Sequence, residues 1–398
     1  MKRRKLIEYS LLGGTALAGQ MVLSSLETAK AVRLPARNQK RFDWIFVYWM
    51  PYDNDLSRFG IPILKMIEKG VKSENILVLV QADFSNTDKM SRWIFSKERV
   101  DREEVNSTNS AREEVFAEYL DWARSQFEAE KWAIAFLGHG GTLDRISPDA
   151  RPGESLAETA ETQWMNIHKL SYLIESFNRQ INNRVELFFF QNCNKGTIEA
   201  HYTLREAAKY TLSSQNLLGA PNYYYESLFQ FLGDHPYLNG GELAEKIIEF
   251  DDLDMYWIYT VTENRYFADL PDQINPVIES ILKANVEAIK LDALNTYSYI
   301  GEKYVDSVEF LQILTEQSGA DRKKCQEAIA FLTVRVLHRL KKDGKLFNIP
   351  YKNSQASGLG LFLPKSKEEL EKYRYLPVFT DLYLPELFEV ILGESFEF

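Results

Sequence analysis

The stretch Val185-Glu-Leu-Phe-Phe-Phe-Gln-Asn-Cys-Asn-Lys-Gly196 decides the fold of this chain. Leu187–Phe190 is a continuous apolar run, which predicts a strand covered on both faces, as in a parallel sheet. Polarity returns at Gln191, Cys193 follows, and segment 197–208 is typical of a helix. We therefore expect Cys193 at the carboxyl end of a buried strand and before a helix N-terminus. Ligands bind at that edge of open α/β sheets, and the helix dipole there favours a thiolate.

A second run, Lys131-Trp-Ala-Ile-Ala-Phe-Leu137, predicts another buried strand and leads into Gly138-His139-Gly140-Gly141. The glycines let other backbone come close to the histidine. If the two strands are neighbours in one parallel sheet, His139 and Cys193 share one cleft. A cysteine needs a base or a cationic neighbour to attack a carbonyl at neutral pH, and histidine supplies either role. Each residue alone is explained as well by core packing or capping, but together they favour a thiol nucleophile site.

Length, charge and cysteine count exclude several classes of protein. The chain has 398 residues, 45% of them hydrophobic and 26% charged, which is enough for a sizeable core and for two or three units. The net charge of −10 argues against nucleic acid or an anionic membrane surface as the main partner. Cys193 and Cys325 do not make a disulfide framework, and no Cys/His cluster has zinc spacing. A bond between the two cysteines is an open alternative, although it would block a catalytic thiol.

The N-terminal residues have the layout of an export signal. Residues 1–5 are basic, residues 11–24 are apolar and small, and Thr28-Ala-Lys-Ala31 fits a small-x-small cleavage site. The apolar run is too short for a spanning helix and is interrupted by Gln20. A membrane anchor that is kept is the alternative.

The pair Arg3-Arg4 is similar to the twin-arginine export signals of bacteria. We therefore expect residues 1–31 to be removed, with 32–42 as a linker. The mature protein is expected in the bacterial periplasm or outside the cell, without stable insertion in a membrane.

Strands and helices alternate along residues 43–250, which is the pattern of a doubly wound, mostly parallel sheet in an α/β protein. Residues 141–162 interrupt it with prolines and small polar residues, and we expect a structureless connection that overhangs His139. Besides the two strands above, strands are expected at 43–49, 75–82, 210–214 and 255–261, a hairpin within 83–104, and helices at 56–70, 110–127, 164–179, 222–232 and 242–250.

The pattern changes after residue 264. Amphipathic helices are expected at 275–291, 307–318 and 324–340, then a short strand at 358–364 and a helical tail. We interpret residues 43–264 as an α/β domain and residues 265–398 as a mainly helical unit packed on it.

Short motifs occur along the chain in a fixed order. They are Tyr48-Trp-Met-Pro-Tyr-Asp-Asn-Asp-Leu56, Phe136-Leu-Gly-His-Gly140, Phe190-Gln-Asn-Cys193 with Glu199-Ala-His-Tyr-Thr-Leu204, and Gly358-Leu-Gly-Leu-Phe-Leu-Pro364. In this order and spacing the chain resembles the clostripain-like cysteine peptidases, in the clan of caspases, legumains and gingipains. The resemblance implies a caspase-like three-layer α/β sandwich.

The resemblance also implies a peptidase that acts on peptide or protein substrates through a Cys/His dyad. Cys193 matches the nucleophile and His139 the general acid/base. The backbone amides of Gly140 and Cys193 match the oxyanion hole, which stabilises charge that develops in the transition state. Characterised family members often cleave their own chain between the histidine and the cysteine.

The sequence itself requires no cofactor, but the resemblance makes calcium stimulation an expectation. Four residues at the carboxyl ends of expected strands offer oxygen ligands for calcium, although helix or turn capping explains them better. The sequence indicates neither the metal ligands nor the oligomeric state. The four residues are Asp53, Asn54, Asp55 and Asp83.

The chain departs from the family at Gln191, where many members have an aspartate that binds a substrate arginine or lysine. A neutral amide cannot supply that charge-assisted hydrogen bond. Ser214 and Gln215, at the end of the fifth strand, offer no acid either. We expect Gln191, Ser214 and Gln215 to bind substrate, with a P1 preference other than arginine or lysine.

Two other functions have to be compared with peptide hydrolysis. An inactive peptide-binding protein on the same scaffold would suit Gln191, but the presence of both dyad residues argues against it. A flavodoxin-like or phosphoryl-binding protein lacks support because no glycine-rich phosphate loop occurs. The aromatic run Tyr223–Tyr225 suits a substrate groove and core packing equally, and surface or core roles are expected for His168, His201 and His338.

Overall fold

The computed structural model describes residues 40–85, 87–152, 161–353 and 355–393. The expected export signal at 1–31 and nearly all of the linker at 32–42 therefore lie outside the described residues. Among the described helices, none combines the length and the apolar character needed to cross a bilayer.

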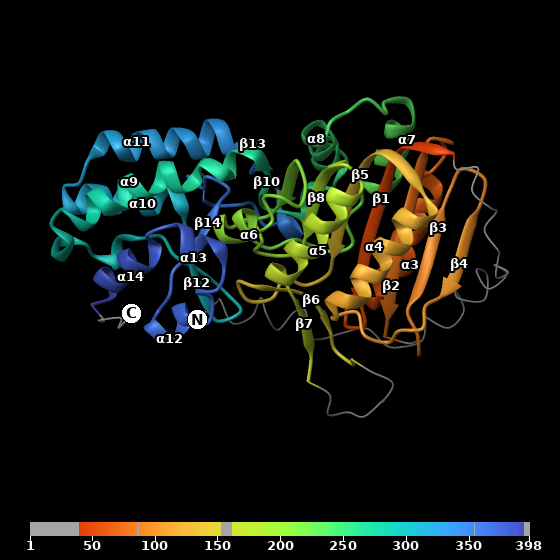
Figure 1. Cartoon of the computed structure of the whole chain (residues 1–398), viewed down its shortest axis with the longest axis horizontal. Coiled ribbons are helices and arrows are strands. Elements are labelled where there is room, and N and C mark those ends of the chain that lie inside the picture. The colour runs from red at the N-terminus through yellow and green to blue at the C-terminus, as the bar shows by residue number, and fades with distance from the viewer. Residues whose placement is uncertain (1–39, 86, 153–160, 354, 394–398) are drawn as a thin grey trace.

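Within the described residues, a nine-stranded mixed sheet forms the centre of the molecule (Figure 1). In order across the sheet, the strands are β13 (Leu337–Lys341), β10 (Tyr259–Glu263), β9 (Tyr210–Ser213), β8 (Val185–Gln191), β5 (Glu128–Leu137), β1 (Arg41–Tyr52), β2 (Ile76–Phe84), β3 (Ser91–Phe95) and β4 (Val100–Glu104). The strands from β9 to β2 run parallel, and antiparallel strands extend both edges. The expected α/β fold, with a parallel core and a hairpin at one edge, is confirmed.

Both faces of the sheet are covered because side chains alternate along each strand. On β1, Phe46 and Tyr48 pack into the core on one face, and Val47 and Trp49 into the core on the other. This alternation gives three layers, in keeping with the expected sandwich. The first face is covered by α3 (Ser57–Gly70), α7 (Tyr225–Asp234) and α8 (Gly240–Phe250), and the second by α4 (Glu113–Gln126), α5 (Ile167–Gln180) and α6 (Ile198–Thr203).

Local capping chemistry sets several helix boundaries. Asn166 accepts hydrogen bonds from the first turn of α5, and Asn239 with Glu242 forms a capping box at the start of α8. Helix α10 (Ser307–Ser318) begins after Asp306, which caps it, and ends at Gly319 with a φ of 72°. A left-handed residue at that position favours glycine, so α10 lies where the sequence predicts it.

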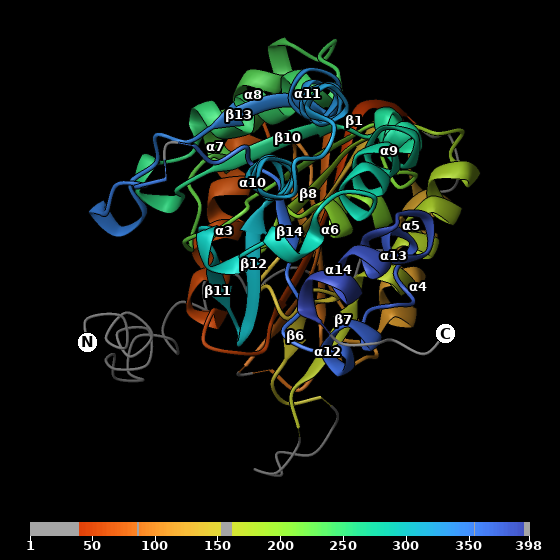
Figure 2. The ribbon, with the colours of Figure 1, turned by 90° about the vertical axis from the view of Figure 1, so that its left-hand side faces the viewer.

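The residues after β10 build a second hydrophobic core, which lies beside the sheet in Figure 1 and in front of it in Figure 2. Ile198 and Tyr202 of α6 contribute to this core, so the C-terminal unit packs directly on the α/β domain. Its helices are α9 (Leu270–Leu282), α10, α11 (Arg322–Ala330), α12 (Lys367–Glu371), α13 (Pro377–Asp381) and α14 (Leu384–Leu392), and its small sheet has the order β11 (Tyr297–Tyr299), β12 (Glu302–Asp306), β14 (Gly360–Phe362).

Short helical turns complete the described chain. The 3-10 turns are η1 (Leu253–Met255), η2 (Asn264–Asp269), η3 (Val286–Ala288), η4 (Leu291–Ala293) and η6 (Leu346–Asn348), and a π-helical turn, η5 (Phe331–Val336), follows α11.

Two sequence predictions about secondary structure are wrong. The connection 141–162 is not structureless, because β6 (Arg145–Asp149) pairs with β7 (Gln163–Asn166) as a small antiparallel sheet. The helix expected at 324–340 continues beyond α11 only through the π-helical turn η5 to Val336, and β13 then joins the edge of the main sheet beside β10. Strand β6 pairs with the next strand along the chain and β13 with a distant one, and in both cases pairing overrides local periodicity.

Candidate active site

His139 and Cys193 lie at corresponding ends of neighbouring strands. Strands β5 and β8 pair in parallel, with Leu137 opposite Gln191, and each dyad residue comes two positions after its paired residue. The Asn192 side chain joins the two ends, since its Nδ2 donates to the carbonyl oxygens of Gly138 at 2.9 Å and His139 at 3.3 Å. The predicted strand neighbourhood is therefore confirmed.

Gly140 lies directly against the backbone of Cys193. A Cβ atom at residue 140 would be 2.0 Å from the Cys193 carbonyl oxygen, which is far closer than atoms can approach. In the part of the chain that the structure describes, neither the Gly140 amide nor the Cys193 amide donates to a backbone carbonyl. The two amides expected to form the oxyanion hole thus belong to adjoining loops, and only glycine fits at the first position.

The His139 ring is oriented by Asp55. His139 Nε2 donates to Asp55 Oδ1 at 2.7 Å, and this hydrogen bond holds the pKa of the carboxyl below its usual range. Among the described residues, His139 Nδ1 has no hydrogen-bond partner. The sequence suggested Asp55 only as a cap or calcium ligand, whereas the structure pairs it with the candidate general acid/base.

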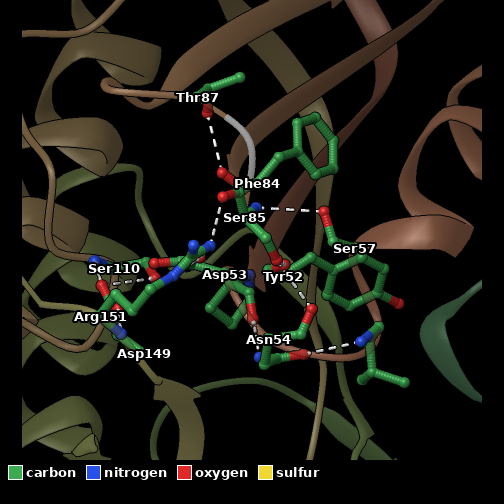
Figure 3. A network of polar contacts seen from close by, with 12 residues as sticks. Tyr52, Asp53, Asn54, Ser57, Phe84, Ser85, Thr87, Ser110, Asp149 and Arg151 are labelled. Atoms are coloured by element: carbon green, nitrogen blue, oxygen red, sulfur yellow. Dashed lines mark hydrogen bonds and ion pairs between the residues drawn. The ribbon is translucent and has the colours of Figure 1, made fainter. Parts of the chain in front are cut away.

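The loop that carries Asp55 is held by the polar network of Figure 3. Arg151 pairs with Asp53 and also donates to the backbone carbonyl of Ser85. Asn54 accepts a hydrogen bond from the amide of Leu56 at 3.0 Å, as in an Asx turn, whereas α3 itself begins without a side-chain cap. The connection after His139 is thereby tied, through Arg151, to the strand ends that position Asp55.

The same network contains two further acids, and neither is an evident calcium ligand. Burial, with the charges of Asp149 and Asp53, raises the pKa of Asp83 above its usual range. Asp149 accepts from the amide of Ser110 at 2.9 Å. Across the described residues, no group of three or more His, Cys, Asp or Glu side chains is arranged to hold a metal ion. We assign no calcium site, and calcium dependence stays a prediction.

Both cysteines are free thiols and do not form a disulfide with each other. Cys193 is partly exposed, and Cys325 is buried. The amide of Leu218 donates to Cys193 Sγ at 3.3 Å, and the thiol lies 3.5 Å from the Leu218 carbonyl oxygen. Burial raises the pKa of this thiol. Helix α6 is short and begins only at Ile198, and the effect of its N-terminus on the thiolate stays a prediction.

Lys195 is a buried cation that sequence reasoning missed. Its Nζ donates to the carbonyl oxygens of Gly141, Thr142 and Leu143 at 3.3, 2.6 and 3.3 Å. It therefore joins the loop after Cys193 to the loop after His139. Burial lowers the pKa of Lys195 to about 8, against the opposing effect of the Glu302 carboxylate. A lysine two positions after the cysteine was the available sequence signal.

Gln191 lies inside a hydrogen-bond network. Its Nε2 donates to Asn222 Oδ1 at 2.6 Å and to the Tyr225 hydroxyl at 2.9 Å, and its Oε1 accepts from Tyr224 at 2.8 Å. Tyr224 and Tyr225 are core residues, whereas Tyr223 is 46% exposed. The amide of Gln191 is thus engaged within the protein.

Ser214 and Gln215 are also buried, so neither is open to a substrate in this structure. The backbone carbonyl of Ser214 accepts from the amide of Gly196 at 2.7 Å, and Gln215 Nε2 donates to Asp306 Oδ2 at 3.1 Å. The bond from Gly196 to Ser214 holds the loop after Cys193 against the end of β9. The substrate-binding role of Gln191, Ser214 and Gln215 stays a prediction.

The other histidines named from the sequence have structural surroundings. His201 is buried between the hydroxyls of Thr262 and Ser213, and burial lowers its pKa to about 3. His338 lies 3.4 Å from Glu245, and the ring of His168 packs on tyrosines.

One known protein family matches most of the chain. The model of the family described as the Clostripain family matches residues 48–382. No curated protein matches the sequence.

Solved structures share the fold over most of the chain. A secreted C11 cysteine protease from Bacteroides thetaiotaomicron, in complex with an irreversible peptide inhibitor, is 15% identical over 85% of this chain and 98% of its own, with a TM-score of 0.64. An inactive zymogen C11 protease from Parabacteroides distasonis is 15% identical over 86% of this chain and 99% of its own, with a TM-score of 0.66. At such low identity these likenesses show a common fold.

Proposed function

Because the chain belongs to the clostripain family of cysteine peptidases, we propose that it is an endopeptidase with Cys193 as nucleophile and His139 as general acid/base. The observation that carries this proposal is the pairing of β5 with β8, which puts both residues at one edge of the sheet. The close contact between Gly140 and the Cys193 backbone adds two amides beside the nucleophile.

In the proposed reaction His139 takes the thiol proton as Cys193 Sγ attacks the carbonyl carbon of the scissile peptide bond. The negative charge on the carbonyl oxygen is stabilised by the amides of Gly140 and Cys193. His139 then gives its proton to the departing amine, which leaves a thioester on Cys193. A water molecule, deprotonated by His139, hydrolyses the thioester and restores the thiol.

Asp55 acts on this reaction as a positioning residue. Its carboxylate holds His139 Nε2 at 2.7 Å, so the ring presents Nδ1 for proton transfer. It also stabilises the imidazolium that forms when His139 takes the thiol proton.

We further propose that the P1 pocket does not prefer arginine or lysine. Gln191 and Asn222, which are bonded to each other, carry no charge. The acid bonded to them, Asp251, already accepts hydrogen bonds from Asn222, from the Tyr259 hydroxyl and from the amide of Tyr223. No carboxylate of this described network is therefore left to receive a substrate cation.

A panel of fluorogenic peptides that differ only at P1 (Arg, Lys, Asn, Asp or Ala) tests both proposals. We expect hydrolysis with neutral or acidic P1 residues, and kcat/KM for the Arg peptide no higher than for the Asn peptide. A hydrogen bond to a charged group is worth roughly 1.5–3 kcal/mol, or about one to two decades in rate. The variant Gln191→Glu should raise kcat/KM for the peptide with Arg at P1 relative to that for the peptide with Asn at P1.

If the wild type preferred Arg over Asn by about one to two decades in kcat/KM, a carboxylate outside this network would have to bind the P1 side chain. An unchanged preference in Gln191→Glu would place Gln191 away from the pocket. The absence of hydrolysis with every peptide, together with peptide binding, would favour the inactive binding protein.

We also propose that the protein is exported and cleaved after Ala31. The basic, apolar and small-residue order of 1–31 supports this, as does the description of a structural relative as secreted. Protein from the periplasmic or medium fraction should begin at Val32 by N-terminal sequencing, and replacing Arg3 and Arg4 by lysine should stop its export. An N-terminus at Met1 in those fractions would refute the cleavage.

A further inference from the structure

A tyrosine from the C-terminal unit lies on the nucleophile. Tyr299 is the last residue of β11, which pairs antiparallel with β12, and its register partner is Glu302. The two residues of the hairpin tip, Ile300 and Gly301, have φ angles of 44° and 80°. A β-branched residue such as isoleucine rarely adopts a left-handed conformation, so the tip that presents Tyr299 is strained.

The Tyr299 hydroxyl reaches both loops of the site. It donates to the Gly140 carbonyl oxygen at 2.5 Å and lies within hydrogen-bonding reach of the Cys193 thiol. On another side of the thiol, the backbone amide and carbonyl of Leu218 contact Cys193 Sγ. The sulfur is thus contacted by Leu218 and lies within reach of the Tyr299 hydroxyl, whereas an attacking thiol needs open space for a substrate carbonyl.

On the β12 side the hairpin turn is fixed by Glu302, whereas the side-chain positions of Ile300 and Gly301 face open space. Glu302 is buried and accepts from the amide of Leu143 at 2.9 Å and from the Tyr304 hydroxyl at 2.6 Å. Ile300 is 52% exposed, and no atom lies within 4 Å of a Cβ placed on Gly301. Lys365 Nζ donates to the Gly301 carbonyl oxygen, so moving the turn away from Cys193 also breaks this exposed hydrogen bond while β12 remains in place.

We propose that Tyr299 is a gate on the nucleophile, which a peptide substrate has to displace before its carbonyl reaches Cys193. This inference rests on the proposed peptidase function. Opening breaks the hydrogen bond from Tyr299 to the Gly140 carbonyl and clears the thiol. Only the fraction of molecules with an open gate binds substrate productively, so the closed gate weakens apparent affinity.

The rate at which iodoacetamide alkylates Cys193 at pH 7 tests the gate without any substrate. All proteins carry Cys325→Ala, so that Cys193 is the thiol modified. We expect alkylation of Tyr299→Ala to be roughly two- to tenfold faster than that of wild type, the factor expected for losing one hydrogen bond. Tyr299→Phe, which keeps the ring but loses its bond to the Gly140 carbonyl, should be intermediate. Ser298→Ala, an exposed neighbour on β11, should match wild type.

Peptide kinetics separate a gate from a positioning residue. A gate predicts a lower KM in Tyr299→Ala with kcat little changed, whereas a residue that aligns the thiol predicts a lower kcat. Unchanged or slower alkylation in both folded Tyr299 variants would overturn the gate, even if peptides are cleaved. If alkylation accelerates but no peptide is cleaved by any protein, the gate stands and the proposed function fails.

Discussion

Cys193→Ala is expected to show no peptide hydrolysis above a protein-free blank, because alanine has no nucleophile. His139→Ala is expected to lower kcat/KM by roughly 10²–10⁴-fold, the usual contribution of a general acid/base. Because the pKa of the Cys193 thiol is raised, few thiolates form without a base, and we expect the loss in kcat/KM of the His139 variant to lie at the upper end of this range. Steady-state kinetics with a fluorogenic peptide measure kcat/KM. Thermal unfolding shows whether each variant is folded.

Cys325→Ala is the matched control. Cys325 is buried in the core of the C-terminal unit, and its thiol lies 3.5 Å from the Leu311 carbonyl oxygen, so its loss should leave kcat/KM unchanged. Turnover retained by cleanly purified Cys193→Ala would refute the mechanism.

Asp55→Asn tests how much the orientation of His139 contributes to the same reaction. The amide keeps the shape of the side chain but removes the charge that orients the His139 ring. We expect kcat/KM to fall by roughly ten- to a hundredfold, as for a catalytic group that is held in a less favourable orientation. An effect as large as that of His139→Ala would instead make Asp55 indispensable to proton transfer.

Lys195→Met is expected to destabilise the protein by roughly 3–5 kcal/mol, as when one partner of a buried charged network is removed. The variant leaves the carbonyl oxygens of Gly141, Thr142 and Leu143 without their shared donor, and it removes the cation beside Glu302. Urea unfolding at pH 7 measures the loss of free energy.

Lys69→Met is the control for charge removal at the surface. The Lys69 side chain is 68% exposed, and its Nζ lies 3.9 Å from Glu226, so we expect a change within about 0.5 kcal/mol. A loss below about 1 kcal/mol in Lys195→Met would mean that water or loop movement replaces the ammonium.

The same comparison has a pH dependence of known sign. The folded protein releases the Lys195 proton at about pH 8, whereas an unfolded lysine keeps it to about 10.4. Between these values the unfolded chain binds more protons, so the free energy of unfolding rises with pH. Below pH 8 the cost of burying the charged ammonium is present in full. The stability difference between wild type and Lys195→Met should therefore widen from pH 8 to 10.

The strands of the central sheet and the positions of His139 and Cys193 follow from the sequence for a local reason. Continuous apolar runs predict strands buried on both faces, and a change to polar residues marks the end of each strand. Because adjacent parallel strands end at one edge, the sequence pattern is enough to put His139 and Cys193 together.

Strand β13 shows where such local patterns fail. An apolar spacing over 324–340 suits a helix, but the segment after η5 pairs with β10 at an edge of the main sheet. Whether a short apolar run is helix or strand depends on the partner it meets, which periodicity does not report.

The sequence by itself determined the sheet, its carboxyl edge and the Cys/His pair. Only the tertiary structure decided the partners of that pair: Asp55 on His139, Lys195 beneath both loops, and Tyr299 on Cys193. It also decided how deeply the Cys193 thiol is surrounded by protein, and this burial raises the pKa of the thiol. These contacts join segments that are far apart in the chain, and they arise from packing between strand ends and between the two units. Residue spacing along one segment carries no information about them.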